Sequence, residues 1–189
     1  MLYFSASYAV AWVLEWVRAF FRTSLPLVAS SLFVAVGIAV HSAYVTFHIQ
    51  DAWQARKLPL ASWSHWCVLA AWVLALVCLS WKLLRPRTSS GFFVLPLILG
   101  LIFTARIVDN DLAFTTSGTS SGSGIVHGLS LLLGIVATHL GCVTGTMYLI
   151  QSRRLKRKLP TGHGLRLPSL EWLERATETA LFCSLVLLL

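Results

Sequence analysis

The fold of this chain is decided by the stretch His65-Trp-Cys-Val-Leu-Ala-Ala-Trp-Val-Leu-Ala-Leu-Val-Cys-Leu-Ser-Trp-Lys-Leu-Leu84. Apolar residues fill it from end to end, and Lys82 carries its only formal charge. A helix of about 20 predominantly apolar residues crosses a hydrocarbon core roughly 30 Å thick. The stretch therefore predicts a transmembrane helix.

Similar apolar stretches lie on both sides of it. They cover residues 2–21, 25–49, 92–108, 125–150 and 170–189. Over the whole chain 57% of the residues are hydrophobic and 12% are charged, whereas a soluble domain has about 25% charged residues. We expect an all-α, polytopic transmembrane helix bundle of about six helices, which forms a single integral membrane domain over residues 1–189.

Basic residues are concentrated in alternate connections between these segments. Because cytoplasmic loops are enriched in Lys and Arg, we expect the N-terminus outside and the protein in the cell (cytoplasmic or inner) membrane. The membrane topology and an attraction to anionic lipid explain the net charge of +8. Nucleic-acid binding is not expected, because it would need a basic face on a folded soluble domain. The connections after the first, third and fifth segments hold Arg18, Arg22, Lys82, Arg85, Arg87, Arg153, Arg154, Lys156, Arg157, Lys158 and Arg166, against Arg56, Lys57 and Arg106 in the others.

The two ends of the chain lead to two further expectations. The first apolar segment lacks a basic start and a small-residue cleavage site, so we interpret it as a retained helix rather than a signal peptide. After Ala176 the last segment has room for about 21 Å of helix at 1.5 Å per residue, and it is still apolar at Leu189. We therefore expect that C-terminal helices are missing from this chain.

Motifs for catalysis are absent from the sequence. It contains no phosphate-binding glycine-rich loop, zinc signature, nucleophile elbow or carboxylate pair, and residues 109–124 are typical of a flexible linker. The cysteines lie in apolar segments without a C-x-x-C pair, where cysteine acts as a small hydrophobe. We expect that the protein is not an enzyme. The cysteines are Cys67, Cys78, Cys142 and Cys183.

Histidines are the residues best suited to bind a ligand. His41 and His139 fall near the middle of their segments, and His48, His65 and His127 fall near the outer ends. Haem iron commonly takes an imidazole as axial ligand, and a bis-histidine site needs one ring from each of two helices. His41 with His139 could form it at mid-membrane depth, and His48 or His65 with His127 could form it near the outer surface. The alternative is that each ring hydrogen-bonds a neighbouring helix or lies in the headgroup region.

Three other sets of side chains allow a structural interpretation. Trp53, Trp63 and Trp66 gather near His65, where an interfacial aromatic belt or an outward platform for a flat ligand would explain them. Glu15 and Arg18, three residues apart, can pair on one helix face. Small residues at helical spacing along the fifth segment predict close helix packing. They are Gly134, Ala137, Gly141 and Gly145.

Three stretches share their order and spacing with a known family. The first is Gly37-Ile-Ala-Val-His41, followed by Lys57-Leu-Pro-Leu60 and Ala71-Trp72, and the second is Gly91-Phe-Phe-Val-Leu-Pro-Leu97. The third starts at His127 and continues with Gly145-Thr-Met-Tyr-Leu-Ile-Gln151, Leu155-Lys-Arg-Lys158 and Leu167-Pro-Ser-Leu-Glu171. Through these stretches the chain resembles the CcsA/HemX-like haem-handling integral membrane proteins of the cytochrome c assembly superfamily.

This resemblance implies haem transport or haem presentation during cytochrome c maturation, together with a membrane partner protein. His41 and His127 occupy the positions of the family's haem-binding histidines, so the resemblance implies that they ligate haem iron. The Trp-rich loop that presents haem in the full synthetases (Trp-Gly-x-Phe-Trp-x-Trp-Asp) is absent here, and we do not expect synthetase activity. Family members usually have more helices than this chain, which agrees with missing C-terminal helices.

The leading hypothesis is a haem-binding or haem-transport membrane protein that assists cytochrome c biogenesis. A general membrane permease or exporter, in which His41 and His139 line a polar pathway, is one alternative. Another is a regulatory or scaffold subunit for tetrapyrrole enzymes, with the basic segment 153–158 as its contact. A cytochrome b-type electron carrier would need histidine pairs on facing helices. Haem is the expected ligand, whether as cargo or as prosthetic group.

Overall fold

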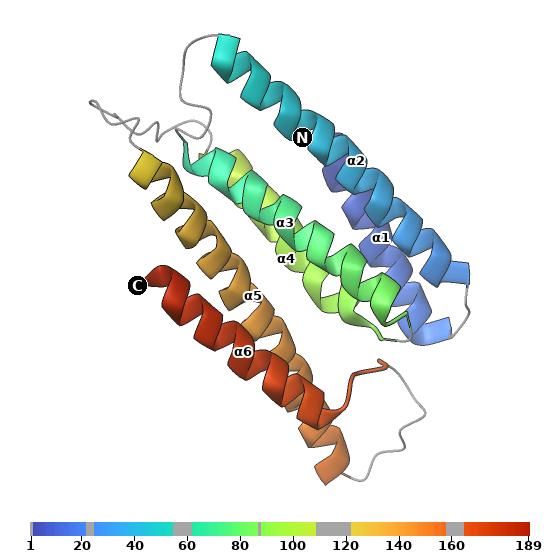
Figure 1. The fold of residues 1–189 in the computed structure, drawn as a ribbon. Coiled ribbons are helices and arrows are strands. Elements are labelled where there is room, and N and C mark those ends of the chain that lie inside the picture. The colour runs from blue at the N-terminus through green and yellow to red at the C-terminus, as the bar shows by residue number, and fades with distance from the viewer. Residues whose placement is uncertain (1, 22–24, 55–61, 87, 109–121, 158–164) are drawn as a thin grey trace.

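The computed structural model describes residues 2–21, 25–54, 62–86, 88–108, 122–157 and 165–189. Within these ranges the chain forms six α-helices (Figure 1). The expected all-α bundle is confirmed. The predictions for Lys57-Leu-Pro-Leu60 and for most of the segment 109–124 lie outside the described residues. The helices are α1 (Leu2–Phe21), α2 (Leu25–Gln54), α3 (Trp63–Leu84), α4 (Ser90–Val108), α5 (Gly122–Lys156) and α6 (Leu170–Leu188).

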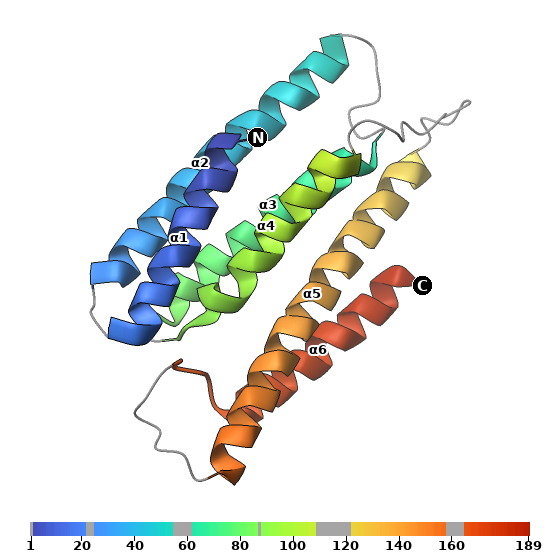
Figure 2. The same cartoon turned by 180° about the vertical axis from the view of Figure 1, so that it is seen from behind.

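The helices pair into three antiparallel hairpins, α1–α2, α3–α4 and α5–α6, which lie side by side with α3–α4 in the middle (Figures 1 and 2). α1 and α2 pack on one side of α3–α4, and α5 packs on the other side. Because the helices alternate in direction, α1, α3 and α5 all end at one end of the molecule. We call this the basic end, since Arg18, Arg85, Arg153 and Arg154 lie there, and we call the other the opposite end.

Four of the helices in the described ranges are long and apolar enough to cross a membrane. They are α3, α4 and most of α2 and α5, the last two over Val28–Gln54 and Val126–Lys156. The chain is therefore an α-helical membrane protein. The described parts of α1 and α6 do not reach this level, so the prediction of six apolar spans is supported for four helices. α1 contains Glu15 and Arg18 among serines and aromatic residues, and α6 begins with Glu171, Glu174, Arg175 and Glu178.

The four-helix part α1–α4 has a tightly packed interior. Tyr8, Leu74, Leu95 and Ile98 are completely buried. A Cβ atom at Gly37 of α2 would lie 2.6 Å from Cε1 of Tyr8, so a glycine is required for this approach of α1 to α2. Close packing of this kind holds helices together in a membrane, because lipid removes the hydrophobic driving force between them.

The α5–α6 hairpin is held by the face of small residues on α5. A Cβ atom at Gly141 would lie 3.1 Å from Cδ2 of Leu181, and the hydroxyl of Thr177 on α6 donates to Oγ1 of Thr144 on α5 at 2.9 Å. A Cβ atom at Gly134 would lie even closer to its neighbour, 2.7 Å from Cγ of Leu188. The close packing predicted for this face is confirmed at Gly134 and Gly141, whereas a Cβ atom at Gly145 would make only an ordinary contact, 3.7 Å from Cγ2 of Thr177.

The hairpin is attached to the rest of the molecule at the basic end. The amide of Ser89 donates to the carbonyl of Arg166 at 2.9 Å, and the amide of Arg166 donates to Oγ of Ser89 at 3.3 Å. The ring of Trp172 on α6 lies 5.2 Å from that of Trp81 on α3. In the described ranges the backbone of α6 does not pack against α1–α4, so α5 and these few contacts make the attachment.

Candidate functional site

A cavity of about 620 Å³ opens at the opposite end, between α3, α4 and α5. Its walls are apolar except for the imidazole of His127 and the thiol of Cys67. This volume lies within the range of about 300–1,000 Å³ that is usual for small-molecule and cofactor sites. The remaining lining residues are Trp63, Trp66, Ala70, Leu101, Gly124, Gly128, Leu131, Leu132 and Ile135.

Helical spacing places these residues on facing surfaces. Residues 63, 66, 67 and 70 share one face of α3, and residues 124, 127, 128, 131 and 135 share one face of α5. A Cβ atom at Gly128 would lie 2.5 Å from Cη2 of Trp66. The missing side chain at Gly128 therefore allows the indole of Trp66 to lie directly against the backbone of α5, one residue from His127.

The residues present fit a haem group. An imidazole is a common axial ligand of haem iron, and His127 is exposed and lines the cavity. Tryptophan rings supply flat, apolar surface, and Trp63 and Trp66 both contribute to the walls. Within the described ranges no three His, Cys, Asp or Glu side chains come together as they would to hold a metal ion, whereas haem iron needs only an axial ligand from the chain.

His48 and His65 lie on the other side of α3 and bind each other. Their Nε2 atoms are 2.8 Å apart, and their rings meet edge to face with centroids 4.7 Å apart. Iron ligated axially by both rings would hold these nitrogens about 4 Å apart, given metal–nitrogen bonds of about 2.0 Å. The contact is thus a hydrogen bond between α2 and α3, and the predicted pairing of His48 or His65 with His127 is not formed.

His41 is completely buried between α1, α2 and α3. The ring of Phe4 stacks on it, with centroids 4.1 Å apart and planes 6° from parallel, and the hydroxyl of Tyr8 lies 3.3 Å from Nδ1. The other nitrogen, Nε2, is buried without a hydrogen-bond partner, although the backbone of Val68 lies near the ring. Phe4 covers one face of the ring and leaves Nε2 as the nitrogen without a protein partner, and His41 does not line the cavity at His127.

The Nδ1 atom of His139 lies 2.8 Å from the carbonyl oxygen of Ile135, one turn earlier on α5. α2 and α5 do not pack directly against each other in the described ranges. The mid-membrane pairing of His41 with His139 stays a prediction, and His127 alone among the five histidines lines the large cavity at the opposite end.

A buried ionic cluster at the basic end includes Lys82, which the charge pattern had grouped with the basic residues of the connection after the third segment. Lys82 lies inside α3 and is 2% exposed, and its Nζ atom is 2.5 Å from Oε1 of Glu15 and also donates to Oγ of Ser30. The predicted pair of Glu15 with Arg18 is present at 3.5 Å. An ionisable group inside a membrane segment needs a partner, and Glu15 in a predicted helix was the signal that could have led to Lys82.

Comparison of the chain with protein-family models, with curated proteins and with solved structures found no match. No family is shown by these comparisons. The likeness to CcsA/HemX-like proteins consequently remains a resemblance carried by the stretches quoted above, and the cavity at His127 carries the functional argument.

Proposed function

We propose that this protein is a haem-binding membrane protein that holds haem in the cavity between α3, α4 and α5. The observation that carries this proposal is the imidazole of His127 on the wall of an apolar cavity of about 620 Å³, beside the indoles of Trp63 and Trp66. Bound haem would supply an iron atom that takes a nitrogen ligand and a flat apolar ring that stacks on aromatic side chains. His127 is the proposed ligand, and the two tryptophans are the proposed walls.

The exposure of these residues favours haem as a passing ligand. Trp63 is 47% exposed and His127 is exposed, so the cavity is accessible from outside the helix bundle. A prosthetic group that stays in place is usually surrounded by protein, whereas a carrier has to release what it holds. The proposed role is therefore haem transport or presentation, in which the apolar walls exclude water and His127 fixes the orientation of the ring.

The biological setting follows from the resemblance and from the charge pattern. Both support a role in cytochrome c biogenesis at the cell membrane, with the basic end on the cytoplasmic side, the N-terminus outside and a membrane partner that receives the haem. The cavity would then lie near the outer surface, where cytochrome c maturation takes place in this family.

The permease alternative has less support than the haem proposal, because the buried polar groups that could line a pathway are bonded within the protein. Glu15 accepts hydrogen bonds from Lys82, Ser30 and Arg18, so its oxygens are engaged within the protein. His41 and His139, which were expected to line a polar pathway, are separated and are bonded to neighbouring groups. A scaffold role through the basic residues at the end of α5 remains a second candidate, because Arg153 and Lys156 are exposed there.

The experiment is a haem titration of the purified protein in lipid nanodiscs, followed through the Soret band. The wild type should bind one haem, and His127→Ala should weaken binding at least tenfold, because the axial ligand is lost. His48→Ala and His139→Ala are matched controls that should bind as the wild type does. Circular dichroism shows whether each variant keeps its helices.

Two outcomes would contradict this proposal. If His127→Ala binds haem normally and a folded His41→Ala variant does not, the ligand is His41 and the cavity at His127 is not the haem site. If no variant and no wild-type sample takes up haem, the protein is not a haem carrier, and the scaffold or permease alternatives replace the proposal.

A further inference from the structure

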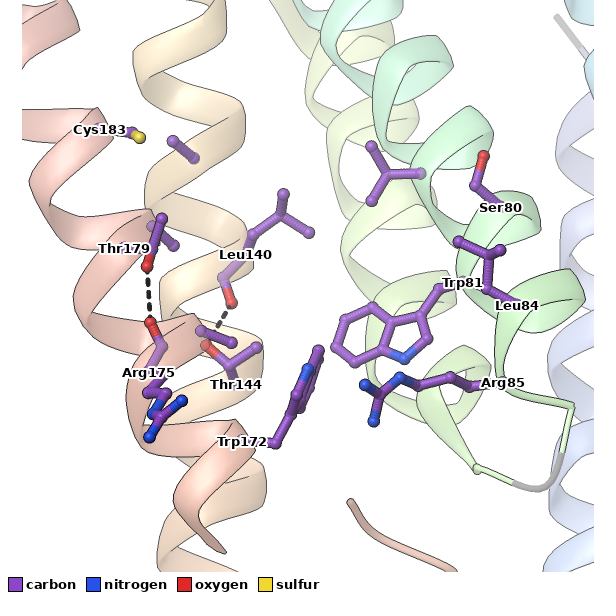
Figure 3. A pocket seen from close by; sticks show the side chains of 14 residues that line it. Ser80, Trp81, Leu84, Arg85, Leu140, Thr144, Trp172, Arg175, Thr179 and Cys183 are labelled. Atoms are coloured by element: carbon purple, nitrogen blue, oxygen red, sulfur yellow. Dashed lines mark hydrogen bonds between the residues drawn. The ribbon is translucent and has the colours of Figure 1, made fainter. Parts of the chain in front are cut away.

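A second large cavity lies at the basic end, between α3 and the α5–α6 hairpin. Its volume is about 700 Å³, and Figure 3 shows side chains of both parts of the molecule pointing into it. Toward the middle of the helices its walls are apolar, with Val77, Leu140 and Ala180. Toward the basic end the walls are the rings of Trp81 and Trp172. The cavity is thus apolar along its length and aromatic at one end.

Arg85 places a positive charge at the aromatic end. Its Cζ atom lies 4.4 Å above the ring of Trp172, and within the described ranges no carboxylate lies at ion-pair distance from it. Arg175, the other cation of the lining, pairs with Glu171 at 2.7 Å. The guanidinium donors of Arg85 are therefore available to an anionic group.

The hydroxyl groups of the lining are already engaged, whereas Nε1 of Trp81 is buried without a hydrogen-bond partner. The hydroxyl of Ser80 donates to the carbonyl of Leu76 at 2.8 Å, and those of Thr144 and Thr179 donate to carbonyls of their own helices at 2.9 Å and 2.8 Å. A bound molecule would meet apolar and aromatic surface over most of the cavity and a free cation at one end. This combination matches an amphiphile with an apolar chain and an anionic head.

The position of Arg85 specifies the kind of amphiphile. Arg85 directly follows the last residue of α3, where a transmembrane helix reaches the headgroup layer, and tryptophan is enriched at that depth. Basic pockets between transmembrane helices on the cytoplasmic side bind anionic lipid headgroups. Arg153 and Arg154 in the last turn of α5 add positive charge at the same end.

We propose that this cavity binds an anionic phospholipid, whose phosphate contacts Arg85 and whose acyl chain lies along Val77 and Leu140. The lipid would fill the seam between α3 and the α5–α6 hairpin, where α6 reaches the rest of the molecule through Trp172. It is thus a structural ligand that joins the two parts, and it is independent of the haem proposed for the opposite end.

Native mass spectrometry of the protein released from nanodiscs tests this assignment. With equal amounts of phosphatidylglycerol and phosphatidylcholine, the wild type should retain mainly phosphatidylglycerol. Arg85→Gln should lower that preference about fivefold, which corresponds to about 1 kcal/mol for one basic residue at the surface. Arg85→Lys keeps the charge and should keep most of the preference, and Arg106→Gln, an equal charge change on the exposed last turn of α4, should have no effect.

Each of three results would overturn it. Equal retention of the two lipids by the wild type would show that no anionic headgroup is selected. Equal losses in Arg85→Gln and Arg106→Gln would show that overall charge, and not this cavity, attracts the lipid. A haem Soret band that weakens in Arg85→Gln while lipid retention stays constant would assign the cavity to haem carboxylates instead.

Discussion

The α1–α4 part and the α5–α6 hairpin are both built from apolar helices, yet they use their side chains differently. In α1–α4 the large side chains of Phe4, Tyr8 and Leu74 are buried against other helices. In α6 the apolar side chains of Phe182 and Val186 are 67% and 60% exposed. Both parts expose apolar side chains at their surface, but α1–α4 has a closed interior with a buried ion pair, whereas α6 buries only Leu173 and Ser184 among its described residues. The two cavities lie where these parts meet, so the seam between the parts is less closely packed than the interior of α1–α4.

Loss of the buried cation should affect α1–α4 most strongly. Lys82→Met leaves the carboxylate of Glu15 without its closest partner, and breaking a buried pair costs about 3–5 kcal/mol in the free energy of unfolding. Unfolding by SDS titration in mixed micelles, followed by tryptophan fluorescence, measures this loss. The matched control in the hairpin is Arg175→Gln, because the Arg175–Glu171 pair is about three-quarters exposed and should contribute about 0.3–0.5 kcal/mol.

A double variant, Glu15→Leu with Lys82→Met, provides the second half of this test. It removes both charges together and should recover most of the stability, because no unpaired charge is left inside the bundle. If Lys82→Met and Arg175→Gln lower the free energy of unfolding by the same amount, the buried ionic cluster does not stabilise α1–α4 more than the exposed pair stabilises the hairpin.

The same small substitution should have opposite effects in the two parts. Gly37→Ala places a Cβ atom 2.6 Å from the ring of Tyr8, and such overpacking should destabilise α1–α4 by about 1–3 kcal/mol. Gly145→Ala brings its Cβ atom 3.7 Å from Cγ2 of Thr177, an ordinary contact. There alanine should stabilise the helix by about 0.5–1 kcal/mol. The same SDS titration measures both, and equal effects would show that the packing around Gly37 is no tighter than the packing around Gly145.

The smallest effect is expected at the contact between the two parts. Trp172→Leu removes the ring contact with Trp81, and aromatic pairs contribute about 0.5–1.5 kcal/mol beyond the area they bury. Hydrogen exchange should therefore rise in α6 and stay unchanged in α1 and α2. Trp53→Leu is the control, since Trp53 is 72% exposed at the end of α2. Faster exchange throughout the molecule would mean that the two parts unfold as one unit.

The helices were predictable from the sequence to within a few residues, with α1 and the start of α6 in agreement. α2 and α5 continue to Gln54 and Lys156, beyond the predicted ends at residues 49 and 150. The prediction followed apolar character, whereas a helix can extend past the hydrocarbon into water as long as its backbone bonds continue. The last turns of these two helices consist largely of polar residues, and a prediction based on apolar character does not include such residues.

The candidate site was predictable only in part. His127 and the tryptophans near the outer end were found as candidates, and the structure brings Trp63, Trp66 and His127 to one cavity. It places His65 on the other face of α3, against His48. The sequence spacing of histidines gives their positions along each helix, but the rotation of one helix against another decides which of them meet.

Composition and charge pattern alone determined that this is an all-α membrane protein with its basic residues in alternate connections. They could do so because the hydrocarbon layer requires each crossing segment to satisfy its own backbone and to carry apolar side chains, so each segment can be judged separately. Only the tertiary structure decided that Lys82 pairs with Glu15, that His41 is covered by Phe4 and that His127 lines a cavity. Those outcomes depend on close packing between helices far apart in the sequence, and no local spacing specifies that packing.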